Sequence, residues 1–370
     1  MTNYEYKFRA PARINLIGEH IDYNGGYVLP CCINMYLDAY VNLRIDNKLI
    51  FKSISFNNVI ETNLDNINYD KKFDWAIYSV GVFYILKKLG YKINKGLEIN
   101  YVSNIPAGSG LSSSAAILDV TFLLLNKLFN LGISNKDIAL YSKMVENEYC
   151  NLKSGIMDEA IIALGKKNQC LLLNCSKFEY KYVDINLLDY EFVVLKTNKP
   201  RKLIESKYNE RVEECNKALD IIKTKYDVKN LCMLKSENLS DIKELLNDEL
   251  LFKRVNHVVK ENERVFEFVK ALKNNDYKLI AKLLNESQES LKNDYETTGY
   301  HLDSICDSAI YAGAIGARST GAGFGGCAIA LIKKNTFNDF SIKLKEKYYK
   351  LTQIYADVYR VEITDGIKEI

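Results

Sequence analysis

The chain has 370 residues, of which 48% are hydrophobic and 26% are charged. This length predicts two domains or one large one, and the apolar share excludes a mainly disordered chain. The 50 Lys and Arg residues nearly balance 47 Asp and Glu, leaving a net charge of +3, so there is no electrostatic basis for nucleic acid as a partner. An anionic ligand is therefore expected to be held by a local site.

Cysteine and histidine positions argue against a disulfide framework and against a zinc site. The nine cysteines form no pair of C-x-x-C motifs, and the three histidines lie near none of them in the sequence. The first residues lack the apolar segment of a signal peptide, and the most apolar helix-like stretch, 115–125, is too short to span a bilayer. We therefore expect a cytoplasmic protein with reduced thiols and no membrane partner.

Strand-like and helix-like segments alternate over the first half of the chain. Alternating apolar residues predict strands at 27–29, 39–45, 49–56 and 96–102. Apolar residues at helical spacing predict helices at 73–89, 113–130 and 136–149, the last opened by a capping box at 134–137.

The sequence pattern changes after about residue 185, where longer and more highly charged helices begin. These are expected at 203–225, 237–247, 255–273, 277–293 and 301–314, followed by strands at 327–333 and 357–364. The pattern predicts an α+β fold in two domains, 1–185 and 186–370, with a boundary between 180 and 190. As an alternative, the last strand folds back onto the first domain.

A segment rich in hydrogen-bonding side chains spans residues 10–26. Arg, Asn, Glu, His and Asp stand there between apolar residues and flexible glycines. A loop of this composition suits a polyhydroxylated ligand, because each sugar hydroxyl needs a donor and an acceptor. The alternatives are a solvated polar turn or a histidine whose hydrogen bonds are satisfied in the core.

A second segment, 105–116, resembles a phosphate-binding turn. Gly108 and Gly110 permit close approach of the backbone, and three serines then lead into a helix whose N-terminus suits an anion. No Lys follows the glycines, which excludes a Walker A loop, and the third glycine of the dinucleotide fingerprint is missing. The alternative is an ordinary glycine-rich turn with a serine N-cap.

A third segment, 316–326, is rich in glycine and runs directly into the strand expected at 327–333. Glycines in this density keep the backbone accessible, so that a ligand or another loop comes very close. The alternative is a structural bulge.

Together these segments resemble the GHMP small-molecule kinases, and within that family the kinases of galactose. The sugar-site signature stands at 13–23, the phosphate loop at 108–115, a Gly-Ile-Met-Asp segment at 155–158, and Thr-Gly-Ala-Gly-Phe-Gly-Gly-Cys at 320–327. The resemblance implies a two-domain fold of mixed sheets and helices with the active site in the cleft between the domains. It also implies ATP-dependent phosphorylation of the anomeric hydroxyl of galactose, with Mg²⁺, by a monomer or weak homodimer.

The resemblance further implies roles for individual residues of this sequence. Asp158 and Arg13 would be catalytic. The residues that would bind the sugar are Glu19, His20, Asp22 and Tyr208. Those that would bind ATP are Ser53, Gly108, Ser109, Gly110, Leu111, Ser112, Ser113 and Ser114. Ser114 and Glu146 would ligate Mg²⁺, with Glu148 as the competing carboxylate.

Four positions depart from the family pattern: Ala12, Asp119, Glu159 and Ser319 stand where Gly, Glu, Gln and Met are usual. Glu159 is expected to add negative charge beside the transferring phosphate. Two alternatives remain open, a kinase of N-acetylgalactosamine or another galactose-like sugar, and a catalytically silent sugar sensor. The sensor is disfavoured because Asp158, Arg13 and the phosphate loop are all present.

Overall fold

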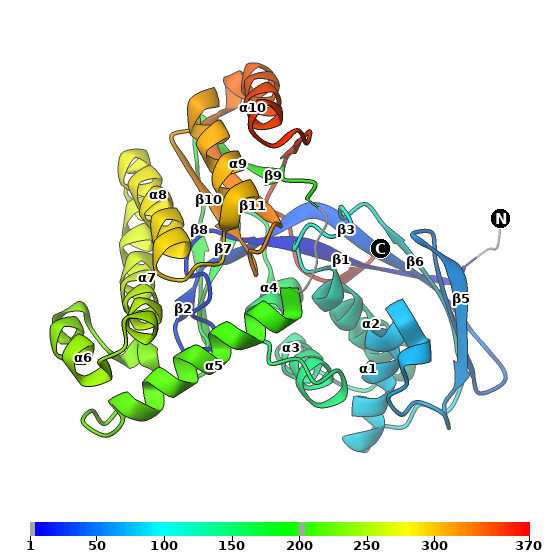
Figure 1. Ribbon diagram of the computed structural model, residues 1–370. Coiled ribbons are helices and arrows are strands. Elements are labelled where there is room, and N and C mark those ends of the chain that lie inside the picture. The colour runs from blue at the N-terminus through cyan, green and yellow to red at the C-terminus, as the bar shows by residue number, and fades with distance from the viewer. Residues whose placement is uncertain (1–3, 200–203) are drawn as a thin grey trace.

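A computed structural model describes residues 4–199 and 204–370 of the chain. Two mixed α+β units lie side by side, each built on its own sheet, with α4 (Met157–Leu164) near the centre of the molecule (Figure 1). The α+β class expected from the sequence is confirmed. None of the helices in the described ranges combines the length and the apolar character that a bilayer-spanning segment requires.

The N-terminal unit is built on a six-stranded sheet. Its strands, in spatial order, are β13 (Lys368–Glu369), β1 (Tyr6–Asn15), β3 (Pro30–Leu43), β6 (Leu97–Ser103), β4 (Lys48–Ser53) and β5 (Phe56–Asn63). All neighbours are antiparallel except β4 and β6. A smaller antiparallel sheet beside it contains β2 (Tyr27–Val28), β7 (Gln169–Asn174) and β8 (Glu179–Asp184).

Helices cover one face of the six-stranded sheet. They are α1 (Ile77–Lys88), α2 (Ser113–Phe129), α3 (Asn135–Met144) and α4. Both α2 and α4 contact β1 and β3, and α2 is buried along most of its length because nearly all of its residues from Ala115 to Leu125 are apolar. A 3₁₀ segment, Lys71–Ala76, leads into α1, and a π-helical turn, Val145–Tyr149, follows α3.

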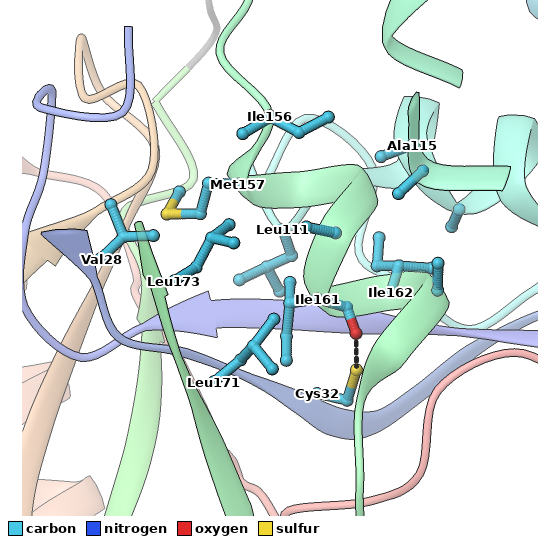
Figure 2. Packing of buried hydrophobic residues seen from close by; sticks show 14 of the residues in the cluster. Val28, Cys32, Leu111, Ala115, Ile156, Met157, Ile161, Ile162, Leu171 and Leu173 are labelled. Carbon is cyan, nitrogen blue, oxygen red and sulfur yellow. Dashed lines mark hydrogen bonds between the residues drawn. The ribbon is translucent and has the colours of Figure 1, made fainter. Parts of the chain in front are cut away.

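The short helix α4 is held in place by burial of its apolar side chains. Met157, Ile161 and Ile162 belong to one buried cluster with Leu171 and Leu173 of β7 (Figure 2). At the same face of the helix, the Cys32 thiol donates to the main-chain oxygen of Ile161 at 3.1 Å. Eight residues make a marginal helix in isolation, so this packing is what fixes the direction of α4 and of the side chains in its first turn.

The C-terminal unit contains a four-stranded antiparallel sheet. Its strands, in spatial order, are β10 (Gly316–Thr320), β11 (Cys327–Lys333), β9 (Tyr190–Lys196) and β12 (Asp357–Arg360). The helices of this unit are α5 (Ile204–Ile222), α6 (Leu239–Leu246), α7 (Glu249–Lys273), α8 (Tyr277–Asn293), α9 (Gly299–Ala312) and α10 (Phe337–Thr352). A second buried cluster joins α9 and α10 to the sheet, and α7 packs against α5 and α8.

The last residues of the chain return to the N-terminal unit. Strand β13 pairs with β1, with Glu369 opposite Phe8, and the C-terminus lies close to β1 in Figure 1. The main-chain N–H of Ile367 donates to Ile162 of α4 at 2.9 Å. The C-terminal segment is therefore part of the scaffold that carries the first sheet and α4.

Several elements differ from the sequence-based expectations. Residues 10–15, expected to form a loop, and the glycine-rich residues 316–320 are strands. Residues 10–15 pair with β3 in a ladder with one register shift after Pro11, and 316–320 pair with β11, so that their backbone groups are satisfied. The strand expected at 49–56 is divided by a turn after Ser53. The helix expected at 136–149 changes to a π-helical turn at Val145, and the strand expected at 357–364 ends at Arg360. The first residue of the helix expected at 203–225 lies outside the described residues.

Candidate active site

A small cavity lies where the two units meet, with a volume of about 190 Å³. Drug-sized ligands occupy roughly 300–1,000 Å³, so this cavity suits a molecule the size of a monosaccharide. Its lining residues are Arg13, Glu19, His20, Asp22, Ser114, Glu146, Ser154, Gly155, Met157, Asp158, Glu159, Tyr208, Gly321 and Ala322.

Arg13 and Asp158 form a bidentate ion pair in the cavity wall. Arg13 Nε donates to Asp158 Oδ1 at 2.7 Å and Nη2 donates to Oδ2 at 2.6 Å. Arg13 comes from β1 and is buried, whereas Asp158 comes from the first turn of α4 and its side chain is 29% exposed. The pair thus combines a fixed guanidinium with a carboxylate that remains accessible from the cavity.

The loop before α2 is attached to this ion pair. Arg13 Nη1 donates to the main-chain oxygen of Gly110 at 2.7 Å, and the hydroxyl of Ser112 donates to Asp158 Oδ2. Ser112 is the N-cap of α2 in left-handed conformation, and its side chain does not cap the helix. The first-turn N–H groups of α2 are therefore left without a serine cap, and no acidic side chain stands in that turn.

Glycines let the third sequence motif approach the same loop. A Cβ on Gly321, which has φ +77°, would lie only 2.8 Å from the main-chain oxygen of Gly110. Gly108, with φ +64°, has open space where its Cβ would be. Close packing thus requires glycine at 321, while at 108 the left-handed backbone favours glycine and leaves room for a ligand.

Glu19 is held in the cavity wall by an ion pair buried in the protein. Arg318 Nη2 lies 2.6 Å from Glu19 Oε1, and the main-chain N–H of Gly321 donates to the same oxygen at 2.9 Å. Burial lowers the pKa of Arg318 to about 9, which still leaves the guanidinium charged at neutral pH. One carboxylate oxygen of Glu19 is thereby fixed.

His20 enters the cavity from a left-handed backbone, with φ 60°. Its Nδ1 is 2.9 Å from the hydroxyl of Tyr23, which is in turn 2.8 Å from the hydroxyl of Tyr295. Burial, with a smaller contribution from His257, lowers the pKa of His20 to about 3. The imidazole is therefore neutral at physiological pH. Tyr208, from α5, packs near it with ring centroids 5.7 Å apart.

Asp22 depends on the absence of a side chain at Gly155. A Cβ at Gly155 would lie 1.6 Å from Asp22 Oδ2, so only glycine fits beside the carboxylate. Burial and then the neighbouring Asp158 raise the pKa of Asp22 to about 6. At pH 7 the group is mostly ionised and acts as a hydrogen-bond acceptor.

A pair of buried carboxyl groups lies on the other side of Asp158. Burial raises the pKa of Glu146, which hydrogen-bonds to Ser154, Glu159 and Ser114. Burial, followed by the charges of Glu146 and Asp158, raises the pKa of Glu159 well above its usual range. This shift favours the protonated form of Glu159 and so opposes the added negative charge that the sequence led us to expect there.

Glu146 and Ser114 offer oxygen ligands of the kind that Mg²⁺ prefers. Within residues 4–199 and 204–370, no group of three His, Cys, Asp or Glu side chains has the geometry of a metal site. A cation here would therefore take most of its ligands from phosphate and water. Mg²⁺ in nucleotide sites is held in this way, by one or two protein oxygens.

The structure brings most of the residues singled out in the sequence to one place, and separates one of them. Ser53 ends β4 at the strand edge and does not line the cavity. Among the residues of the phosphate loop, only Ser114 lines the cavity. Gly110 and Ser112 do not line it but form hydrogen bonds with Arg13 and Asp158, respectively.

Sequence reasoning assigned no role to Arg318 or Gly155. The signal for Arg318 was its position in a segment of otherwise small residues, since a buried guanidinium needs a carboxylate partner. Its partner Glu19 lies almost 300 positions away, which a single sequence does not reveal. Gly155 was noted only as part of a motif, although its contact with Asp22 explains the need for glycine.

Three family models match the chain. The galactokinase galactose-binding signature matches residues 2–42, the GHMP kinase N-terminal domain residues 77–166, and the GHMP kinase C-terminal domain residues 268–350. These ranges contain the sugar-site motif, the phosphate loop with Asp158, and the glycine-rich segment.

Similar proteins extend the match to the full chain. The galactokinase of Clostridium acetobutylicum is 42% identical, over 100% of this chain and 95% of its own length. The galactokinase of Clostridium perfringens is 43% identical, over 98% and 95%. The crystal structure of Lactococcus lactis galactokinase complexed with galactose superposes with a TM-score of 0.96, at 39% identity, over 99% of this chain and 95% of that one. The chain belongs to the GHMP kinase family, and within it to the galactokinases.

Proposed function

We propose that this galactokinase transfers the γ-phosphoryl group of ATP to the anomeric hydroxyl of galactose, giving galactose 1-phosphate and ADP. The observation that carries the proposal is the Arg13–Asp158 ion pair, which faces a sugar-sized cavity on one side and the phosphate loop on the other. The galactose bound in the Lactococcus lactis relative supports the choice of sugar.

Sugar binding is assigned to the polar wall opposite the phosphate loop. Glu19, His20 and Asp22 present two carboxylates and a neutral imidazole to the cavity, and Tyr208 closes it from α5. Each sugar hydroxyl both donates and accepts a hydrogen bond, so this mixture of groups pairs several hydroxyls at once. A site of this kind rejects an isomer that leaves one of its buried groups unpaired.

ATP binding is assigned to the loop from Gly108 to Ser114 and to the N-terminus of α2. The uncapped first-turn N–H groups and the positive end of the helix dipole suit phosphate oxygens. Ser114 and Glu146 would hold Mg²⁺, which would neutralise phosphate charge in the complex. Ser53, at the end of β4, is kept as a proposed contact of the nucleotide outside the cavity.

Asp158 is the proposed acceptor of the anomeric proton. Its Oδ1 receives the Nε–H of Arg13, and a carboxylate oxygen has a second lone pair for the sugar hydroxyl. Arg13 keeps the carboxylate oriented and offsets charge on the transferring group. Because the transition state of phosphoryl transfer is loose, positioning and electrostatics supply most of the acceleration.

Two finer alternatives concern the sugar and the activity itself. N-acetylgalactosamine or another galactose-like sugar would replace galactose if the wall beside its C2 position accepts a larger group. A silent sensor would bind the same ligands without turnover. The intact ion pair and phosphate loop favour the kinase.

The chain is further proposed to act in the cytoplasm as a monomer or weak homodimer, with galactose and MgATP as its partners and without nucleic acid or membrane. The nine cysteines, which all lie within the described residues, are thiols, in line with a reducing compartment.

The substitution Asp158→Asn tests the proposal. Asn keeps the size of Asp and one acceptor oxygen, but it takes up no proton and loses the charge that faces Arg13. We expect turnover to fall about 10²–10⁴-fold while the affinities for galactose and MgATP stay near wild type. Calorimetric binding and a thermal midpoint control for folding. Glu159→Gln, which introduces the neutral residue usual in the family, should keep or improve activity. A folded Asp158→Asn enzyme with wild-type kcat would refute the assignment.

A further inference from the structure

The backbone of the sugar-binding segment is held by side chains from α7, which lies in the other half of the chain. Glu261 Oε1 accepts from the main-chain N–H groups of Gly18, at 2.9 Å, and Glu19, at 3.2 Å. His257 Nε2 lies 3.0 Å from the main-chain oxygen of Glu19. Both polar backbone groups of Glu19 are thus bound to two side chains one helical turn apart.

The partners of these two side chains fix their roles. A carbonyl oxygen only accepts, so His257 donates to Glu19 through Nε2–H. Glu261 also accepts from Ser287 Oγ at 2.8 Å and from Arg264 Nε at 2.7 Å. Burial alone would raise the pKa of Glu261, but Arg264 and His257 lower it overall, so the carboxylate is ionised. Neither residue lines the cavity.

The segment they hold is strained at the point where it reaches the sugar site. His20, the next residue, has φ 60°, a left-handed conformation that is unfavourable for a residue with a side chain. The peptide bond that joins Glu19 to His20 includes the carbonyl of Glu19, and His257 holds this carbonyl by a hydrogen bond. The ring of His257 also packs in a tilted arrangement against Tyr295, with centroids 4.4 Å apart, and Tyr295 packs in the same way against His20 at 4.9 Å.

We propose that Glu261 and His257 are positioning residues for the sugar, which set the direction of Glu19 and His20 by binding the peptide between them and its neighbours. The inference rests on the proposed roles of Glu19 and His20 in sugar binding. In the described part of the chain, Glu261 and His257 form no hydrogen bond with the phosphate loop or with Asp158. Loss of their hydrogen bonds to the backbone is therefore expected to weaken galactose binding and to leave ATP affinity and the chemical step unchanged.

The test compares variants that remove each hydrogen-bonding group while keeping its shape. Glu261→Met removes all acceptors, and His257→Phe removes the donor but keeps the aromatic ring. We expect the KM for galactose to rise about 10–100-fold in the first and about 3–10-fold in the second, from loss of charged and neutral hydrogen bonds respectively. The kcat and the KM for ATP should stay within about twofold of wild type.

Conservative variants and a matched control separate positioning from general destabilisation. Glu261→Gln keeps an acceptor and His257→Gln keeps a donor, so each should recover most of the galactose affinity. Glu263→Gln changes a carboxylate on the same helix that binds Ser236 away from the cavity, and it should leave all constants unchanged. Thermal midpoints are recorded for every variant.

Each outcome of these experiments either supports or overturns the inference. A galactose-specific rise in KM with rescue by both Gln variants supports the inference. Folded Met and Phe variants with unchanged galactose KM would overturn it, as would a fall in kcat with both KM values unchanged. If Glu261→Met does not fold because Arg264 loses its partner, His257→Phe decides alone. Wild-type enzyme without galactose turnover would instead refute the proposed function.

Discussion

Asp22 illustrates how the cavity sets the chemistry of a single side chain. Its carboxylate is enclosed beside Gly155, and burial together with the charge of Asp158 raises its pKa to about 6. The charge of Lys143 acts in the opposite direction but is the weaker influence. An acceptor for a sugar hydroxyl is thus present at neutral pH and is lost in mildly acidic solution.

This raised pKa predicts an acid limb in the pH profile for galactose. Above pH 6 Asp22 is mostly ionised and accepts from the sugar, whereas below pH 6 it is protonated. The ionised fraction falls about tenfold between pH 7 and pH 5, and kcat/KM for galactose should fall with it. In Asp22→Asn, whose side chain does not titrate, the limb assigned to this group should disappear. An identical limb in that variant would assign it to another group.

At the scale of residues, sequence motifs located the site well but not its supports. Arg13, Glu19, His20 and Asp22 stand in the polar segment 10–26, Asp158 was indicated by the family resemblance, and all five line one cavity. The partners that orient them were not found, because Arg318 and Glu261 are joined to Glu19 only by the tertiary fold. The burial that raises the pKa of Glu159 was likewise not visible in the sequence.

At the scale of elements, an irregular turn places one of the site's carboxylates and a regular helix places another. Glu146 stands on the π-helical turn Val145–Tyr149 that follows α3, and Asp158 stands in the first turn of α4. The π-turn directs Glu146 inward, where it is buried, while Glu148 on the same turn is exposed and pairs with Lys88. Helical periodicity predicted one regular helix here, because a single inserted residue hardly changes the apolar pattern.

The two carboxylates of the π-turn provide a matched test of the proposed Mg²⁺ ligand. Glu146→Gln removes the charged oxygen ligand, and the Mg²⁺ concentration for half-maximal activity should rise about tenfold or more. Glu148→Gln changes the exposed neighbour and should leave this concentration unchanged. Titration of Mg²⁺ at fixed ATP measures both. A shift in the Glu148 variant alone would transfer the ligand to that residue.

Strands within the motifs were also missed, for a physical reason. Residues 10–15 and 316–320 carry mostly polar or small side chains, which are poor indicators of strands. Yet β1 pairs with β3, with one register shift after Pro11, and β10 pairs with β11 along its whole length. Long helices with clear apolar faces were predicted better, and α8 has the bounds expected for it. The local sequence pattern is enough to predict a helix with one apolar face. A strand of polar or small residues depends instead on the strands that it pairs with.

At the scale of the whole molecule, the two units are joined twice. The chain passes from the N-terminal unit to the C-terminal unit between β8 and β9, near residue 185. It returns to the N-terminal unit between β12 and β13. We propose two domains divided near residue 185, with the last residues belonging to the first. The alternative considered for the strand expected at 357–364 is wrong for its first part, because β12 pairs with β9. Its last residues do return to the first unit, where Ile363 forms a bridge with Ile33.

The returning segment is expected to contribute measurably to stability. Ile367 is 8% exposed and its N–H binds α4, whereas Ile370 is 44% exposed. Ile367→Ala should lower the free energy of unfolding by about 2–4 kcal/mol through lost burial and a residual cavity. Ile370→Ala should change it by less than about 0.5 kcal/mol. Urea unfolding of both variants makes the comparison, and equal effects would show that the return is not anchored by Ile367.

The central claim is that the assembled cavity selects galactose for phosphorylation. The direct measurement is ADP release by the wild-type chain with MgATP and, in turn, galactose, N-acetylgalactosamine, glucose, arabinose or mevalonate. We predict efficient turnover of galactose and a kcat/KM for glucose lower by up to about 10⁴-fold, because an equatorial C4 hydroxyl leaves buried groups of the site unpaired. Turnover of mevalonate alone, or equal kcat/KM for glucose and galactose, would contradict the account.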